Sequence, residues 1–450
     1  MMLKKSFVMA CIFSLAVSAA FAGETNSSLL KMTSLNNIII ADINKGVLGY
    51  KEITTDNYLL RKMQVIAYLE KDYDRAVKFS NEILKTGLKN EDLQILYLLR
   101  SEVYVRQNNY QAAYADLSKA IDFGDLGNEA YVLSCKRRSY IFKKDFYKGK
   151  FSNDEKMLLN QVHDLSAVIN GNEVGVDVYD RANIYIKLGA LNHKYYSLAL
   201  KDYRRILEQK ENNVYAENNT RKGFSAHYCA EIYRDLKDNQ KALEYYSMAA
   251  TLLDDSTMNV YSKNVLIENC HLERAKILQS SKDYKAALEE FNILLKMDTD
   301  NWTYYNGRGG CYFRLKHYDE ALADFHKQRE LYPTRASAYN NIALSLMHLQ
   351  RYDEAIEYVD QALAMEAREV SRFSSYDNKA DILLHMNKLH EAMEWINKIP
   401  EEKYSGNNWF TKARIYAALG DKEKARAAVK KAIKMDTDQM QEAKELLKNL

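Results

Sequence analysis

The sequence predicts an all-α protein built from stacked helix pairs, on two observations. Only two prolines (Pro333 and Pro400) and 16 glycines occur in 450 residues, so the chain lacks the turn residues that a sandwich, a barrel or a multi-strand α/β domain needs at each connection. The segment YDEALADF at Tyr318 also returns as YKAALEEF at Tyr284 and as YDEAIEYV at Tyr352, so that three equivalent alanines lie 34 residues apart. A fixed period of this length is typical of solenoids, in which each unit stacks on the next.

The composition narrows the classes of function. With 28% charged and 47% hydrophobic residues, the chain has the composition of a globular protein and not that of a disordered or multi-span membrane protein. Its 64 basic and 61 acidic residues nearly balance, so no strongly basic surface is available for a polyanion. We therefore expect no nucleic-acid partner.

Residues 1–22 are predicted to be a signal peptide. Two lysines precede an apolar run over residues 7–17, and Ala20-Phe21-Ala22 places small residues at the two positions that a signal peptidase reads. A lipoprotein box ending at Cys11 is the alternative, but it would leave only a few apolar residues before the cysteine. The mature chain is thus expected to be exported to the periplasm or the extracellular space.

No transmembrane span is expected in the mature chain. The apolar run of the signal is shorter than the roughly 20 residues that a spanning helix needs, and no comparable run follows it. Residues 23–56 have one repeat length and an apolar stretch at 37–40, so they are predicted to form an atypical opening helix pair.

Ten repeat copies then share two columns of small residues, one in each predicted helix of a pair. The second-helix column is small at nine of ten positions: Ala76, Ala113, Gln161, Ala199, Ala242, Ala287, Ala321, Ala355, Ala392 and Ala425. The first-helix column is also small at nine of ten positions: Gln64, Ser101, Cys135, Ala182, Ala230, Ala275, Gly309, Ala343, Ala380 and Ala413. Two helices cross closely only where their side chains are short, so these columns mark the contact within each pair.

This period and the pattern of Gly309, Tyr312, Ala321, Phe325 and Pro333 resemble the tetratricopeptide repeat family. The resemblance implies a right-handed α-solenoid of about ten helix-turn-helix repeats. The regular repeats cover 57–126 and 176–437, and 127–175 forms an irregular repeat with an insertion. Residues 438–450 are predicted to form a helix that covers the last apolar face.

A cluster of basic residues lies in the irregular repeat, interleaved with aromatic residues. It comprises Lys136, Arg137, Arg138, Lys143, Lys144, Lys148 and Lys150. Such a cluster could bind an anionic glycan, a lipid headgroup or an acidic partner. The alternative is a solvated charged linker, which is the usual role of a surface charge run.

The sequence predicts no enzyme, no metal site and no cofactor. The nine histidines are scattered without metal-ligand spacing, and no Gly-x-Ser-x-Gly motif occurs. Four cysteines remain after the signal (Cys135, Cys229, Cys270 and Cys311); their spacing fits no metal or redox pattern, and we expect buried single thiols, with disulfides as the alternative.

The resemblance implies a concave groove lined by the first helices, which holds a peptide or a partner helix. Carried over by register, the groove would present Thr303, Asn306, Arg314, Ser337, Asn340, Asn341, His348, Ser374, Asp377, Asn378, His385, Asn407, Phe410 and Arg414. Short polar side chains at matching positions can bond the backbone of an extended chain whatever its sequence.

The leading hypothesis is accordingly a non-enzymatic scaffold of the periplasm or cell envelope that binds a protein or peptide. The alternative is a factor for polysaccharide export or glycan binding, with the basic cluster as its contact site. The oligomeric state and the partner are not predicted.

Overall fold

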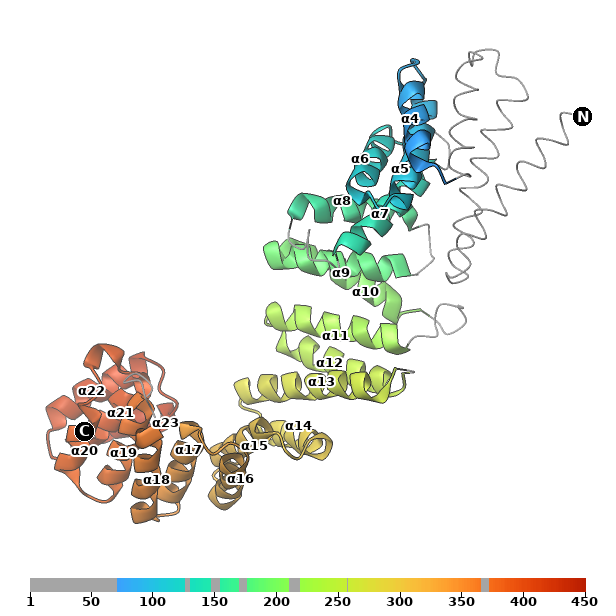
Figure 1. Cartoon of the computed structure of the whole chain (residues 1–450). Coiled ribbons are helices and arrows are strands. Elements are labelled where there is room, and N and C mark those ends of the chain that lie inside the picture. Colours follow the sequence, from blue (N-terminus) through green and yellow to red (C-terminus); the bar gives the residue numbers. More distant parts are fainter. Residues whose placement is uncertain are drawn as a thin grey trace, which may run out of the picture. The chain divides into compact units, whose positions relative to one another are not determined.

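The computed structural model describes residues 71–125, 130–146, 154–169, 176–209, 219–256, 258–365 and 372–450. In these ranges the chain forms helices α4 to α23 and two short 3-10 helices, with no strand, so the predicted all-α solenoid is confirmed (Figure 1). The predicted signal peptide (1–22), opening pair (23–56) and first helix of the first repeat lie outside the described residues.

The chain divides into two compact units, Met1–Arg221 and Lys222–Leu450. The described helices of the first unit are α4 (Tyr73–Leu84), α5 (Asn90–Arg106), α6 (Tyr110–Asp122), α7 (Ala130–Phe146), α8 (Glu155–Val168), α9 (Val176–Leu191), η1 (His193–Tyr195) and α10 (Tyr196–Leu207).

The second unit begins within α11 (Asn219–Asp235). Its other helices are α12 (Asn239–Asp254), α13 (Val260–Ser280), α14 (Tyr284–Met297), α15 (Trp302–Arg314), α16 (Tyr318–Leu331), α17 (Ala336–His348), α18 (Tyr352–Met365), α19 (Phe373–His385), α20 (Leu389–Ile396), η3 (Glu401–Lys403), α21 (Gly406–Ala418), α22 (Lys422–Lys434) and α23 (Met440–Asn449). No described helix is long and apolar enough to cross a membrane.

Consecutive helices pack in pairs, and each pair packs on the next. In the second unit, α15 packs on α16, α17 on α18 and α21 on α22, and α16 and α17 join successive pairs. The first helices of neighbouring pairs are also in contact with one another. Helix α17 contacts α19, and α19 contacts α21. The first helices therefore form one continuous wall of the unit.

The two columns of small residues lie where the helices of a pair cross. Every alanine of both columns in the described ranges is fully buried, including Ala321, Ala343 and Ala355. At Gly309 an added Cβ would lie only 2.8 Å from the Phe325 ring, which is too close for any side chain without movement of that ring.

The irregular third repeat is a true helix pair, because α7 packs on α8. Gln161 occupies the small position of α8 and is only 1% exposed. It fits because Ser139 opposite it is short and accepts from the Gln161 amide through both its carbonyl oxygen and its Oγ. A hydrogen bond thus replaces the close alanine contact of the other repeats.

Arginine–carboxylate pairs connect the repeats, a feature that the sequence analysis missed. Arg308 of α15 donates through Nε and Nη2 to both oxygens of Asp324 on α16, at 2.8 and 2.7 Å, and through Nη1 to Asn292 of the preceding repeat at 2.8 Å. The same arrangement recurs in the first unit: Arg100 bonds Asp116 and Asn81, Arg138 bonds Asp164 and Ser118, and Arg181 bonds Asp202 and Ser166. Each arginine joins both helices of its own pair to the pair before it.

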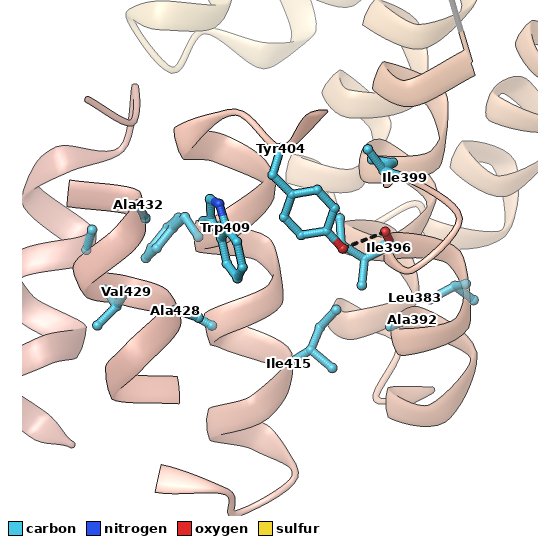
Figure 2. Close-up of a cluster of buried hydrophobic side chains, with 14 residues drawn as sticks. Leu383, Ala392, Ile396, Ile399, Tyr404, Trp409, Ile415, Ala428, Val429 and Ala432 are labelled. Atoms are coloured by element: carbon cyan, nitrogen blue, oxygen red, sulfur yellow. Dashed lines mark hydrogen bonds between the residues drawn. The ribbon is translucent and has the colours of Figure 1, made fainter. Parts of the chain in front are cut away.

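The C-terminal end of the second unit has its own hydrophobic cluster (Figure 2). Tyr404 packs edge-on against Trp409, and its hydroxyl donates to the Ile396 carbonyl at 2.9 Å. Helix α23 packs on α22 and fully buries Ala443 in the same cluster.

Candidate functional site

The first helices of the second unit line an open polar pocket of about 430 Å³. Its polar lining comprises Gln279 of α13, Asn306 and Arg314 of α15, Asn341 and His348 of α17, Asp377, Asn378 and Asp381 of α19, Asn407 and Thr411 of α21, and Asp438 and Gln439 from the α22–α23 loop. Apolar contributions come from Phe313, Leu344 and Met347. The pocket thus combines amides, carboxylates and a few apolar side chains over five successive repeats.

The loop between α22 and α23 forms one side of this pocket. Asp438 accepts from Arg314 of α15 and from Asn407 of α21, both at 3.1 Å. Asn407 Oδ1 in turn accepts from the backbone N–H of Asp438 at 2.9 Å and from Thr437 Oγ1 at 2.8 Å. These bonds hold the loop against α15, which lies far earlier in the chain.

Amide side chains from adjacent repeats bond to one another in the pocket. Asn341 donates through Nδ2 to Asn306 Oδ1 at 3.1 Å. Each amide keeps further donor and acceptor capacity for a ligand, because an amide side chain has two N–H groups and two acceptor lone pairs.

The two arginines at the pocket are each paired with an acid. Arg414 of α21 donates to Asp381 and, at 3.0 Å, to His385 Nε2, while Arg314 bonds Asp438. Burial lowers the pKa of His348 and of His385, so both rings are uncharged at neutral pH. His348 also stacks on Tyr318, with ring centroids 4.5 Å apart.

Asp377 is the lining carboxylate that these arginines leave without a cation. Its Oδ1 is buried and accepts no hydrogen bond from any residue in the described part of the chain. Burial, and then the negative charge of Asp381, raise the pKa of Asp377 to about 6, although Thr411 and Asn408 hydrogen-bond to its side chain and oppose that shift.

Comparison with known proteins places these repeats in a family. Models of the tetratricopeptide repeat match residues 272–336, 334–399 and 407–439, which together include most of the helices that line the pocket. Residues 272–399 and 407–439 thus form tetratricopeptide repeats. Proteins with such repeats are generally non-enzymatic scaffolds for protein–protein interactions.

The chain is 22% identical over 293 residues to a TPR repeat-containing protein of Methanocaldococcus jannaschii, in a match that covers 62% of this chain and 47% of the relative. It is 28% identical over 105 residues to the type IV pilus assembly protein PilF of Pseudomonas aeruginosa, covering 23% and 42% of the two chains. The chain therefore spans less than half the length of either relative.

Among solved structures, a tetratricopeptide repeat protein from Parabacteroides merdae is 21% identical with a TM-score of 0.43. That match covers 70% of this chain and 97% of the other.

The structure of the repeat protein brings part of the predicted groove together. Asn306, Arg314, Asn341, His348, Asp377, Asn378 and Asn407 all line the pocket, and His385 and Arg414 lie beside it. Thr303, Ser337 and Ser374 are exposed and do not line it.

Two predicted groove residues are buried instead. Phe410 is 4% exposed and belongs to the C-terminal hydrophobic cluster, so a partner cannot reach it. Asn340 is 7% exposed and bonds Ser375 in the next repeat, donating to its Oγ at 2.8 Å. The repeat register predicted the correct helix for both Phe410 and Asn340, but packing within the solenoid buries both side chains.

Five polar residues of the pocket lining were not predicted from the sequence: Gln279, Asp381, Thr411, Asp438 and Gln439. Asp381 follows Asp377 by one helical turn, a spacing that puts both on one face, so its position could have been predicted. No local signal pointed to Asp438 and Gln439, which were assigned to the end helix.

The basic cluster is smaller than its sequence suggested. Arg138 is 5% exposed and bonds Asp164 in the repeat core, and Arg137 pairs with Glu102 at 3.4 Å. Both lie on α7 and not in an insertion, as do Lys136, Lys143 and Lys144. Lys148 and Lys150 lie outside the described residues, as do the side chains of Lys143 and Lys144.

Cys135, His163 and Asp164 bring three potential metal-ligand atoms within 4.8 Å of one another in the first unit. Both Asp164 oxygens already accept from Arg138, at 2.7 and 2.8 Å. Burial raises the pKa of the Cys135 thiol to about 12, so the thiolate that a metal needs is disfavoured. The group therefore fits a structural ion pair better than a metal site.

Cys135, Cys229, Cys270 and Cys311 are all buried, and no disulfide joins any two of them. Burial raises the pKa of the Cys270 thiol to about 12 and that of Cys311 to about 11. Thiols of this kind react slowly with oxidants, since the thiolate is the reactive form.

Proposed function

We propose that this repeat protein is an exported, non-enzymatic scaffold that holds an extended segment of a partner protein in the pocket of its second unit. Membership of the tetratricopeptide repeat family supports the general role of protein binding. The observation that carries the specific proposal is the polar pocket along the first helices of five repeats. The export part of the proposal rests on the N-terminal lysines, apolar run and Ala20-Phe21-Ala22.

The chemistry of the lining suits a peptide backbone. An extended chain presents N–H and C=O groups along both sides, and amides such as Asn306 and Asn341 can serve either group. Phe313 and Met347 offer apolar contact for its side chains. Because the wall is fixed by helix packing, little ordering of the receptor is needed on binding, which favours affinity.

A tryptophan at Gly310 tests the proposal by filling the pocket. Gly310 lines the pocket, and a Cβ added there meets no atom within 4 Å, whereas a Cβ at Gly307 would lie 2.2 Å from the Phe291 ring. Peptides selected from a random 12-residue display library on the wild-type protein should bind Gly310→Trp roughly tenfold or more weakly. Affinity is measured by fluorescence anisotropy, and the melting temperature should change little.

Ala323→Trp is the matched control, because Ala323 is exposed on α16 outside the pocket lining. It should leave peptide affinity unchanged. The proposal is wrong if the selected peptides bind Gly310→Trp as tightly as wild type, or if the library yields no peptide that binds the protein.

A further inference from the structure

The charges of the pocket do not balance, and the imbalance centres on one residue. Three carboxylates line it (Asp377, Asp381 and Asp438), while Arg414 pairs with Asp381 and Arg314 with Asp438. His348 and His385 are neutral near pH 7, for the burial reason given above. Asp377 is thus the lining carboxylate that forms no ion pair with any residue in the described part of the chain, although the charge of Arg414 acts on it from beyond ion-pair distance.

A buried carboxylate oxygen that accepts no hydrogen bond costs free energy in a folded protein. Asp377 Oδ1 is in this position, and the aspartate side chain still faces a pocket large enough for part of a ligand. The terminal torsion of aspartate is broad, so a partial rotation of the carboxylate can turn Oδ1 toward a donor in the pocket. A bound cation would satisfy both the missing hydrogen bond and the missing charge.

We propose that the pocket recognises a lysine or arginine side chain of the partner segment, whose cationic group binds the Asp377 carboxylate. This inference rests on the proposed function and names the side chain that the groove selects. An acidic side chain would instead meet Asp377, which forms no ion pair, and two carboxylates whose cations are already engaged, so it would be rejected. A neutral side chain would leave Asp377 Oδ1 without a donor.

Defined peptide pools test this selection. The probes are fluorescein-labelled 11-residue pools of uncharged residues that differ only at the central position, which holds lysine, arginine, norleucine, acetyl-lysine or glutamate. The lysine and arginine pools should bind the wild-type protein roughly tenfold more tightly than the other three, as a desolvated charge pair predicts. The acetyl-lysine pool keeps the aliphatic stem of lysine and removes its charge, so it tests the role of the charge without any change in the protein.

Asp377→Asn should reduce the preference for lysine over norleucine to less than about twofold, since an amide keeps the shape and loses the charge. Asp353→Asn, at an exposed acid on α18, is the control and should keep the full preference. Circular dichroism establishes that both variants are folded.

The outcomes separate this inference from the proposed function. If all pools bind equally well and all are lost with Gly310→Trp, the pocket binds peptides and the selection of a basic side chain is wrong. If binding of the pools is unaffected by Gly310→Trp, both proposals fail. Displacement of the lysine pool by 1,4-diaminobutane at equal concentration would indicate a site for a free amine and would overturn the inference.

Discussion

At the scale of single residues, Asp377 makes the stability of the second unit depend on pH. Burial and the charge of Asp381 raise the pKa of Asp377 to about 6 in the folded chain, against about 3.9 for an unfolded aspartate. Between these values the folded state binds more protons than the unfolded state. The stability that the raised pKa of Asp377 contributes to the folded state is therefore fully present below about pH 4 and is lost as the pH rises through 6.

Asp377→Asn should consequently be more stable than wild type at pH 8, with a gain on the order of 1–3 kcal/mol that vanishes near pH 4. Urea unfolding between pH 4 and pH 8 measures this difference in the free energy of unfolding. Asp353→Asn, at an exposed acid on α18, is measured in the same way as the control. The other charged or titratable groups at the pocket are the same in both proteins, so their contributions largely cancel in the comparison: Asp381, Asp438, His348, His385, Arg314 and Arg414. A gain that stays constant with pH would mean that Asp377 is ionised normally.

At the scale of helices, the repeats are held by small-residue contacts within each pair and by arginine bonds between pairs. The Arg308 guanidinium is 23% exposed and Asp324 only 7%, so the bonds that they form are largely shielded from water. A partly buried, bidentate pair of this kind contributes more than an exposed ion pair, and its loss leaves a carboxylate uncompensated.

Arg308→Met should therefore lower the free energy of unfolding by about 2–4 kcal/mol, because Asp324 loses its cation while the apolar stem is kept. Arg351→Met is the control: Arg351 pairs with Glu354 on the exposed face of α18, where water screens the pair and little change in stability is expected. Chemical denaturation measures both changes. Replacing Asp324 by leucine in the Arg308→Met background should recover much of the loss, and failure to recover it would contradict the ion-pair explanation.

At the scale of the whole molecule, the proposed export has to be compatible with a repeat scaffold in which Cys135, Cys229, Cys270 and Cys311 form no disulfide. In an oxidising compartment such thiols persist only if they are shielded, and all four are buried. The fold is thus compatible with export without the cross-links that small exported domains need.

N-terminal sequencing of the protein from a secreting bacterial host should begin at Gly23, because Ala20-Phe21-Ala22 fits the cleavage site. The lysine pair should be needed for this processing, so Lys4→Glu with Lys5→Glu should slow it. Intact Met1 on cytosolic material would contradict export and leave the fold and the pocket unaffected.

The sequence by itself determined the repeated helix pairs and the residues at which they cross. Both features are local patterns: a period of 34 residues, and an alanine such as Ala321 or Ala355 at each crossing. They determine which residues meet because the two helices that cross are neighbours in the chain. The sequence also placed seven of the twelve polar pocket residues on the correct helix face, since successive turns repeat the same orientation.

Only the tertiary structure decided which of these residues a partner can reach. Phe410 and Asn340 follow the groove register, yet the neighbouring repeat buries them, because burial depends on how successive pairs are rotated. Asp438 reaches Arg314 across 124 residues of chain, a contact that no local pattern encodes. The same packing pairs both pocket arginines with aspartates other than Asp377, which forms no ion pair. The net charge that a ligand meets in the pocket therefore could not be predicted from composition.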